Sequence, residues 1–147
     1  MPIRTIIIDD ERLARNELKK LLQQHSDIEV IEEAANVDEG IEKIEALAPE
    51  LIFLDIQMPG KTGFDLLAEI DKAPRVIFTT AYDEYAIKAF EVNALDYLLK
   101  PIEPKRLSDA IQKLHYEIQK EQAIAQNGRS LLTEDDQVFV KDGEKCW

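Results

Sequence analysis

The chain has 147 residues, 45% of them apolar, which is enough to bury one substantial core, and we expect one globular domain with an appendage. Its formal net charge of −12 argues against nucleic-acid binding by these residues themselves, because contact with phosphates requires a basic face. A single cysteine excludes an internal disulfide, and the first residues lack a signal peptide. No apolar run approaches the roughly 20 residues of a membrane span. We therefore expect a cytoplasmic protein without membrane insertion.

The first part of the chain contains an apolar run, a helical pattern and an alternating run. Residues 5–8 predict a buried strand, which ends on the acidic residues Asp9 and Asp10. A helical pattern follows, with apolar side chains on one stripe between positions 14 and 22 and with the arginine and lysine side chains largely off that stripe. Residues 28–32 alternate apolar and polar side chains, which is typical of a half-exposed edge strand.

The middle of the chain contains a second helical pattern and the most apolar run. Asn36 followed by Glu39 is a variant of the capping box and predicts that a helix begins there. Residues 51–54 are four large apolar residues in succession, which indicates a strand buried on both faces of a sheet. This run ends on Asp55, and Pro59-Gly60 then predicts a loop.

The remaining patterns continue the alternation of strands and helices. They predict a helix at 64–70, a strand at 75–80, a helix at 82–90, a strand at 95–99 and a helix from Pro104 to about Gln126, where Asn127-Gly128 should end it. Asp142-Gly143 between two β-prone runs predicts a hairpin in residues 138–147.

Five strands alternating with five helices predict a (βα)5 doubly wound α/β domain, with a parallel sheet in the flavodoxin-like order 2-1-3-4-5. In that order, a crevice opens at the carboxyl ends of strands 1 and 3. We therefore expect Asp9 and Asp10 to face Asp55 across the crevice, with Thr80 and Lys100 at the same edge of the sheet.

Three carboxylates in one crevice repel one another, by roughly 4 kcal/mol per close pair at an effective dielectric constant near 20, so a positive group should share the site. Mg²⁺ prefers oxygen ligands, and the predicted site offers carboxylates without a thiolate or an imidazole. Lys100 and the hydroxyl of Thr80 are able to hold phosphoryl oxygens. An aspartate in such surroundings can attack phosphorus and hold it as an acyl phosphate.

These motifs resemble the receiver domain of bacterial two-component response regulators over residues 3–120. The resemblance is carried by Asp9-Asp10, Asp55 with the following Ile-Gln-Met-Pro-Gly, Thr80-Ala81 and the stretch Tyr97-Leu-Leu-Lys100-Pro101. Residues 81–97 further resemble the LytTR subgroup, whose receivers precede a β-rich DNA-binding domain. By this resemblance, residues 1–122 are the receiver, and residues 123–147 are a linker and the truncated start of the DNA-binding domain.

The resemblance implies how the acidic residues act. Asp55 would accept a phosphoryl group from a sensor histidine kinase or a small donor. Asp10, Asp55 and the backbone carbonyl of Gln57 would bind Mg²⁺, and Asp9 would contribute through water. Lys100 would contact the phosphoryl oxygens, and its peptide bond to the following proline is often cis in receivers.

The resemblance also implies a switch. Thr80 would turn toward the phosphoryl group, and Tyr97 would follow it inward. The chain would then be a phosphoacceptor that takes part in its own Mg²⁺-dependent phosphotransfer, and not an enzyme with a separate substrate. We expect a homodimer on activation, and transcription regulation through DNA contacts made only by the C-terminal domain that is largely missing here.

Two other functions and several structural roles are alternatives to this interpretation. A phosphatase that forms an aspartyl phosphate usually has a second aspartate where this chain has Gln57, which disfavours turnover. A flavodoxin-like flavin site would need hydroxyl or glycine residues to bind the flavin phosphate, whereas this chain has Asp9 and Asp10 there. Taken singly, Asp9 is also a suitable helix N-cap, and Tyr97 a suitable packing residue. Thr80 and Lys100, taken singly, could satisfy backbone groups or face solvent at a strand end.

Overall fold

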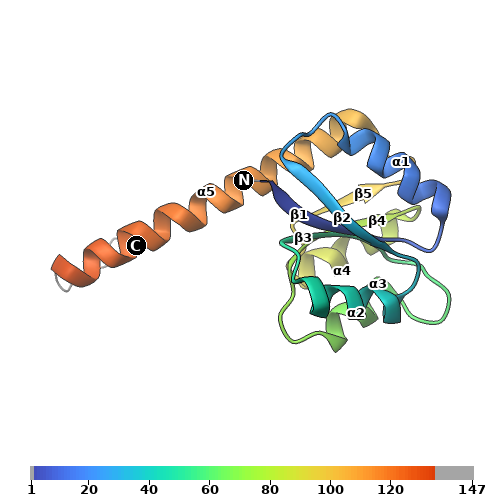
Figure 1. The fold of residues 1–147 in the computed structure, drawn as a ribbon, viewed down its shortest axis with the longest axis horizontal. Helices are drawn as coiled ribbons and strands as arrows, with labels where there is room; N and C mark the ends of the chain where they lie inside the picture. The colour runs from blue at the N-terminus through green and yellow to red at the C-terminus, as the bar shows by residue number, and fades with distance from the viewer. Residues whose placement is uncertain (1, 135–147) are drawn as a thin grey trace. The chain divides into compact units, whose positions relative to one another are not determined.

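The apolar runs of the sequence form a five-stranded parallel sheet with the strand order β2-β1-β3-β4-β5 (Figure 1). The computed structural model describes residues 2–134. Its strands are β1 (Ile3–Ile8), β2 (Ile28–Ala34), β3 (Leu51–Asp55), β4 (Arg75–Thr80) and β5 (Asp96–Leu99). The predicted doubly wound, flavodoxin-like arrangement is confirmed.

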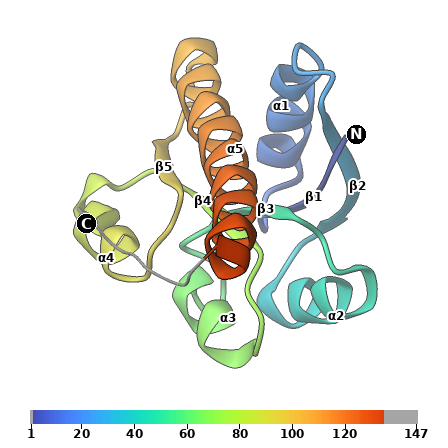
Figure 2. The same cartoon turned by 90° about the vertical axis from the view of Figure 1, so that its left-hand side faces the viewer.

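Each strand is followed by helical structure. The helices are α1 (Arg12–Leu22), α2 (Val37–Leu47), α3 (Gly63–Glu69), the short 3-10 helix η1 (Asp83–Tyr85), α4 (Ala86–Glu91) and α5 (Pro104–Glu134). Helices α2, α3 and α4 cover one face of the sheet, and α1 lies on the other face (Figure 2). The core between the sheet and helices α2, α3 and α4 is built mainly from buried aliphatic side chains and Phe78.

Strand β3 lies at the centre of the sheet, and all five of its residues are buried. It pairs with β1 on one side, where Ile8 is level with Leu54, and with β4 on the other, where Asp55 is level with Thr79. An uninterrupted apolar run suits a strand that is covered on both faces, as the sequence predicts. The carboxyl ends of β1 and β3 therefore lie side by side.

The predicted start of α2 is confirmed by its capping contacts. The side chain of Asn36 accepts a hydrogen bond from the backbone N–H of Glu39, and the Glu39 carboxylate accepts one from the N–H of Ala35. Helix α3 has a full capping box, in which Thr62 and Asp65 each accept a hydrogen bond from the other's backbone N–H. These caps satisfy amide groups that the first turn of a helix leaves without partners.

Two helix predictions differ from the structure. The single helix predicted at 82–90 is divided into η1 and α4, because Tyr82 is extended and the first turn is 3-10. The predicted end of α5 near Gln126 is wrong, since the helix continues through Asn127-Gly128 to Glu134. One glycine costs only about 1 kcal/mol relative to alanine inside a helix, so it does not by itself stop one.

The described residues fall into two compact units that divide between Ala110 and Ile111, within α5. The predicted hairpin at 138–147 lies outside the residues that the structure describes. The domain boundary at residue 122 stays a prediction. Within 2–134, no helix combines the length and the apolar character needed to cross a lipid bilayer.

Candidate functional site

The three predicted acidic residues lie together at the carboxyl edge of the sheet. Asp9 and Asp10 follow β1 directly, and Asp55 is the last residue of the neighbouring strand β3. One carboxylate oxygen from each of the three lies within 4.8 Å of the others. The sequence prediction that strand ends would bring these carboxylates into one cluster agrees with this geometry.

The members of the cluster differ in their exposure to solvent. Asp9 and Asp55 are each 4% exposed, whereas Asp10 is more open. Burial, followed by the negative charge of Asp9, raises the pKa of the Asp55 carboxyl to about 7, and the positive charge of Lys100 acts in the opposite direction. The pKa of Asp55 thus reflects a carboxylate that has lost water and has gained negative neighbours, which is a common feature of functional sites.

Lys100 supplies the positive charge that the sequence predicts for this site. Its ammonium nitrogen lies 2.8 Å from an oxygen of Asp9 and 3.5 Å from an oxygen of Asp55. Burial by itself would lower the pKa of Lys100, but the hydrogen bond to Asp9 and the charge of Asp55 outweigh burial and raise it. The peptide bond between Lys100 and Pro101 is cis, as the resemblance implies.

Thr80 and Tyr97 are linked through the backbone of Tyr82. The Tyr82 N–H donates to the hydroxyl of Thr80 at 3.1 Å, and the Tyr97 hydroxyl donates to the Tyr82 carbonyl at 2.8 Å. Thr80 is buried, and Tyr97 is half-buried. Burial, followed by the charges of Asp83 and Glu84, raises the pKa of Tyr97, so its hydroxyl stays a donor at neutral pH.

Gln57 lies two residues beyond Asp55, in the loop between β3 and α3, and its side chain is exposed. Its role as a backbone ligand stays a prediction. The same loop depends on Gly63, because a Cβ atom at that position would lie 2.6 Å from the backbone oxygen of Asp55. The N–H of Gly63 donates to the carbonyl of Ile56, which holds the start of α3 against the end of β3.

A pocket of about 660 Å³ opens beside the cluster. It is lined by α1 and by residues that follow β1, β4 and β5, among them Asp9, Ala81 and Lys100. Asp9 and the neighbouring Lys100 are therefore reached from solvent on the α1 side of the sheet.

The sequence patterns missed one residue that contacts the cluster. Arg15 was assigned to the polar side of its helix, but its side chain is only 14% exposed, and its guanidinium donates to the backbone carbonyl of Asp9 at 2.7 Å. Its position six residues after Asp9 was the only local signal, and this signal did not distinguish a solvated arginine from a buried one.

The family model of the response regulator receiver domain matches residues 5–112. An uncharacterized response regulatory protein of Vibrio cholerae is 52% identical over 111 residues, which cover 74% of this chain and 47% of that protein. The transcriptional regulatory protein BtsR of Salmonella typhi is 47% identical over 139 residues, which cover 93% of this chain and 56% of that protein. This chain spans about half the length of these relatives.

Solved structures have the same fold. The REC domain of AraT, a response regulator from Geobacillus stearothermophilus, superposes with a TM-score of 0.74 at 30% identity, covering 83% of this chain and 99% of that one. The response regulatory domain of protein mrkE from Klebsiella pneumoniae gives a TM-score of 0.72 at 32% identity, covering 80% and 99% of the two chains. Together with the match over residues 5–112, these likenesses show that the chain belongs to the response regulator receiver domain family.

Proposed function

We propose that this chain is the phosphoacceptor switch of a bacterial transcription regulator, in which a sensor histidine kinase or a small acyl phosphate donates a phosphoryl group to Asp55. The observation that carries the proposal is the cluster at the end of β1 and β3, where three carboxylates lie within 4.8 Å and Lys100 contacts two of them. A lone strand-end aspartate would need neither the other two acids nor a half-buried lysine.

Asp55 is suited to be the nucleophile by position and by chemistry. Its ionised oxygen forms the new bond to phosphorus, while the bond from phosphorus to the donor's imidazole nitrogen or acyl oxygen breaks and the leaving group takes the bonding electrons. Lys100 is placed to hold a phosphoryl oxygen, because its ammonium already reaches Asp55 at 3.5 Å. Its positive charge also favours the ionised form of Asp55, against the effect of burial.

The donor set fits Mg²⁺. All three clustered side chains offer oxygen, and within residues 2–134 the cluster contains no histidine or cysteine. We assign the ion to Asp10, Asp55 and the backbone carbonyl of Gln57, with Asp9 acting through water. When bound, Mg²⁺ would neutralise part of the negative charge of the acids and of the incoming phosphoryl group. Asp10 is the most open of the three carboxylates, so the ion can keep several of its waters.

We assign the switch to Thr80 and Tyr97. The Thr80 hydroxyl would leave the Tyr82 N–H and donate to the phosphoryl group, and Tyr97 would leave the Tyr82 carbonyl and turn inward. Because both side chains hold the same backbone residue, a change at one alters the support of the other. The exposed side chains of α4 and β5 would then carry the signal.

We place the output in a further domain, because the relatives are longer than the matched region. We propose that residues 1–122 are the receiver and that residues 123–147 lead into a LytTR-type DNA-binding domain, with a homodimer forming on activation in the cytoplasm. Two features support a further regulatory part: the relatives are about twice as long as the matched region, and BtsR is named a transcriptional regulatory protein.

Mass spectrometry after incubation with Mg²⁺ and acetyl phosphate tests the proposal. We expect a mass gain of one phosphoryl group in the wild-type chain and none in Asp55→Asn. Asp71→Asn is the matched control, because it makes the same chemical change at an exposed position outside the cluster, and it should accept phosphate normally. Equal labelling of Asp55→Asn would refute the site, and sustained release of phosphate from a panel of monoesters would refute the switch.

A further inference from the structure

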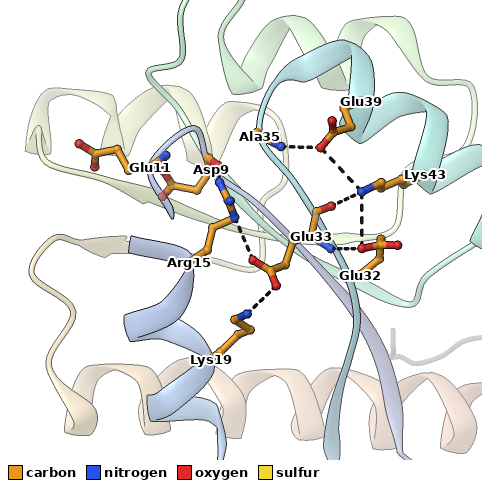
Figure 3. Close-up of polar contacts among 9 residues, drawn as sticks. All are labelled: Asp9, Glu11, Arg15, Lys19, Glu32, Glu33, Ala35, Glu39 and Lys43. Carbon is orange, nitrogen blue, oxygen red and sulfur yellow. Dashed lines mark hydrogen bonds and ion pairs between the residues drawn. The ribbon is translucent and has the colours of Figure 1, made fainter. Parts of the chain in front are cut away.

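Arg15 of α1 connects three parts of the structure beside Asp9 (Figure 3). Its Nη1 donates to the backbone carbonyl of Asp9 at 2.7 Å, and its Nε donates to a carboxylate oxygen of Glu33 at 2.9 Å. Glu33 lies on the edge strand β2. One guanidinium therefore joins the loop after β1, the first helix and the edge of the sheet.

Glu33 is itself held from two further directions. The ammonium of Lys19 donates to its second carboxylate oxygen, and the ammonium of Lys43 on α2 donates to its backbone carbonyl (Figure 3). Hydrogen bonds from Lys19 lower the pKa of Glu33 most, and those from Arg15 lower it as well, against the effect of burial, so the carboxylate is charged at neutral pH. The position of Arg15 is thus set by the charged carboxylate of Glu33, and Lys19 and Lys43 in turn hold Glu33 in place.

The polar groups of Asp9 are all engaged in this arrangement. Its N–H donates to the carbonyl of Ala34 at 3.0 Å, and its carbonyl accepts from Arg15. Its carboxylate accepts from the N–H of Glu11 at 2.9 Å and lies 2.8 Å from Lys100. Removing the Arg15 contact would leave the peptide between Asp9 and Asp10 without the contact that fixes its carbonyl.

We infer that Arg15, anchored by Glu33, is a positioning residue for the metal ligands at Asp9 and Asp10. This inference rests on the proposed function, because it concerns the same acidic cluster. Its physical basis is that the Asp9 carbonyl belongs to the peptide that also carries the amide of Asp10, so a fixed carbonyl sets the direction in which Asp10 leaves the strand. Partners that orient metal ligands in this way commonly change affinity for the ion.

The sign of the effect separates positioning from simple electrostatics. Arg15 brings positive charge close to a site that binds a cation. By Coulomb's law, removing that charge should make Mg²⁺ bind more tightly. If Arg15 acts by positioning, removing it should make Mg²⁺ bind more weakly. The two accounts therefore predict changes in opposite directions.

Calorimetric titration of the full chain with Mg²⁺ alone tests the inference. We expect Arg15→Met to raise the dissociation constant about tenfold, and Arg15→Lys to restore part of the loss. Lys19→Met is the matched control, since it removes the same charge and another ion pair of Glu33, and its dissociation constant should stay within about twofold of wild type. A dissociation constant for Arg15→Met equal to or below that of wild type would overturn the inference.

Phosphorylation by acetyl phosphate gives a second measurement. In Arg15→Met, the Mg²⁺ concentration for half-maximal rate should rise, while the rate at saturating Mg²⁺ should stay within about twofold of wild type. A lower saturating rate with an unchanged half-saturation would show that Arg15 acts otherwise. If Arg15→Met does not fold, as judged by circular dichroism, Glu33→Gln replaces it, with Glu32→Gln as the control because it removes the same charge from the neighbouring exposed residue of β2. Equal Mg²⁺ affinity in these two variants would overturn the inference. Failure of the wild-type chain to bind Mg²⁺ would overturn the proposed function as well.

Discussion

The carboxyl edge of the sheet has two halves that are held in different ways. In the acidic half, Asp9 and Asp55 are buried, Asp9 has several hydrogen-bond partners, and Lys100 reaches both carboxylates. In the other half, Thr80 and Tyr97 each make one hydrogen bond to the backbone of Tyr82, a residue that is 48% exposed. Rearranging the acidic half should therefore cost more free energy than rearranging the half around Tyr82.

This difference suits a switch. Ion binding and phosphoryl transfer need groups whose positions do not change, because a misplaced ligand weakens every later step. Transmission needs groups that exchange one partner for another at small cost, and a net hydrogen bond of about 0.5–1.5 kcal/mol meets that requirement. We call the acidic half the fixed half, and the half around Thr80, Tyr82 and Tyr97 the replaceable half, because its hydrogen bonds can be exchanged. The four predictions that follow test this distinction.

The largest effect should come from removing a carboxylate of the acidic half. Asp10→Asn should weaken Mg²⁺ binding about 100-fold, because one of three clustered charged oxygens is lost. Thr80→Val, in the other half, should leave Mg²⁺ affinity unchanged. Calorimetric titration measures both variants. A comparable loss of affinity in Thr80→Val would mean that the two halves are not independent.

The second effect concerns stability and pH in the absence of Mg²⁺. The pKa of Asp55 is raised from 3.8 to about 7 in the folded chain, so the folded state binds the proton more tightly than the unfolded state. The contribution of Asp55 to the free energy of unfolding should therefore fall as pH rises from about 4 to about 7, and stay level above that. Asp55→Asn lacks this penalty and should be more stable than wild type by roughly 1–3 kcal/mol near pH 8, with no difference below about pH 4.

Urea unfolding in the presence of a chelator measures this pH dependence, and Asp71→Asn serves as the control at an exposed position. Added Mg²⁺ should reduce the difference between wild type and Asp55→Asn, because the ion favours the ionised carboxylate. A difference of constant size from low to high pH would show that burial of the Asp55 charge is not its cause.

The third effect tests how tightly the end of β3 is packed. Gly63→Ala should destabilise the chain by roughly 1–3 kcal/mol, because the new Cβ would meet the backbone oxygen of Asp55, which cannot move without the strand. Gly40→Ala is the comparison, since its Cβ would approach movable side-chain methyl groups of Ile8 and Leu66. Chemical unfolding measures both. A larger loss in Gly40→Ala would contradict the idea of a rigid acidic half.

The smallest effect should come from the replaceable half. Tyr97→Phe removes the hydrogen bond to the Tyr82 carbonyl and should cost about 0.5–1 kcal/mol of stability, since Tyr97 is only half-buried. Mg²⁺ affinity and phosphorylation of Asp55 should not change. Tyr116→Phe, at a position that is 64% exposed, controls for loss of a tyrosine hydroxyl. Slower phosphorylation in Tyr97→Phe alone would place Tyr97 in the fixed half.

Residues whose position is set by the end of a strand were predictable from the sequence. Asp9 and Asp55 end apolar runs, and parallel neighbours bring such ends together whatever the rest of the chain does. Arg15 and Gly63 were not predictable, because their importance depends on groups of distant segments. Arg15 lies 18 positions before Glu33, and nothing in the helical pattern indicates that the edge strand presents a carboxylate to it.

The sequence by itself determined the alternation of strands and helices, the strand order and the acidic cluster at one edge, because apolar periodicity and chain connectivity are local properties. Only the tertiary structure decided that the Asp9 carbonyl is held by Arg15, that Tyr82 joins Thr80 to Tyr97, and that α5 continues through Asn127-Gly128. The first two depend on which backbone groups lie next to a side chain once the sheet and its helices have assembled. Side-chain type alone does not specify that pairing.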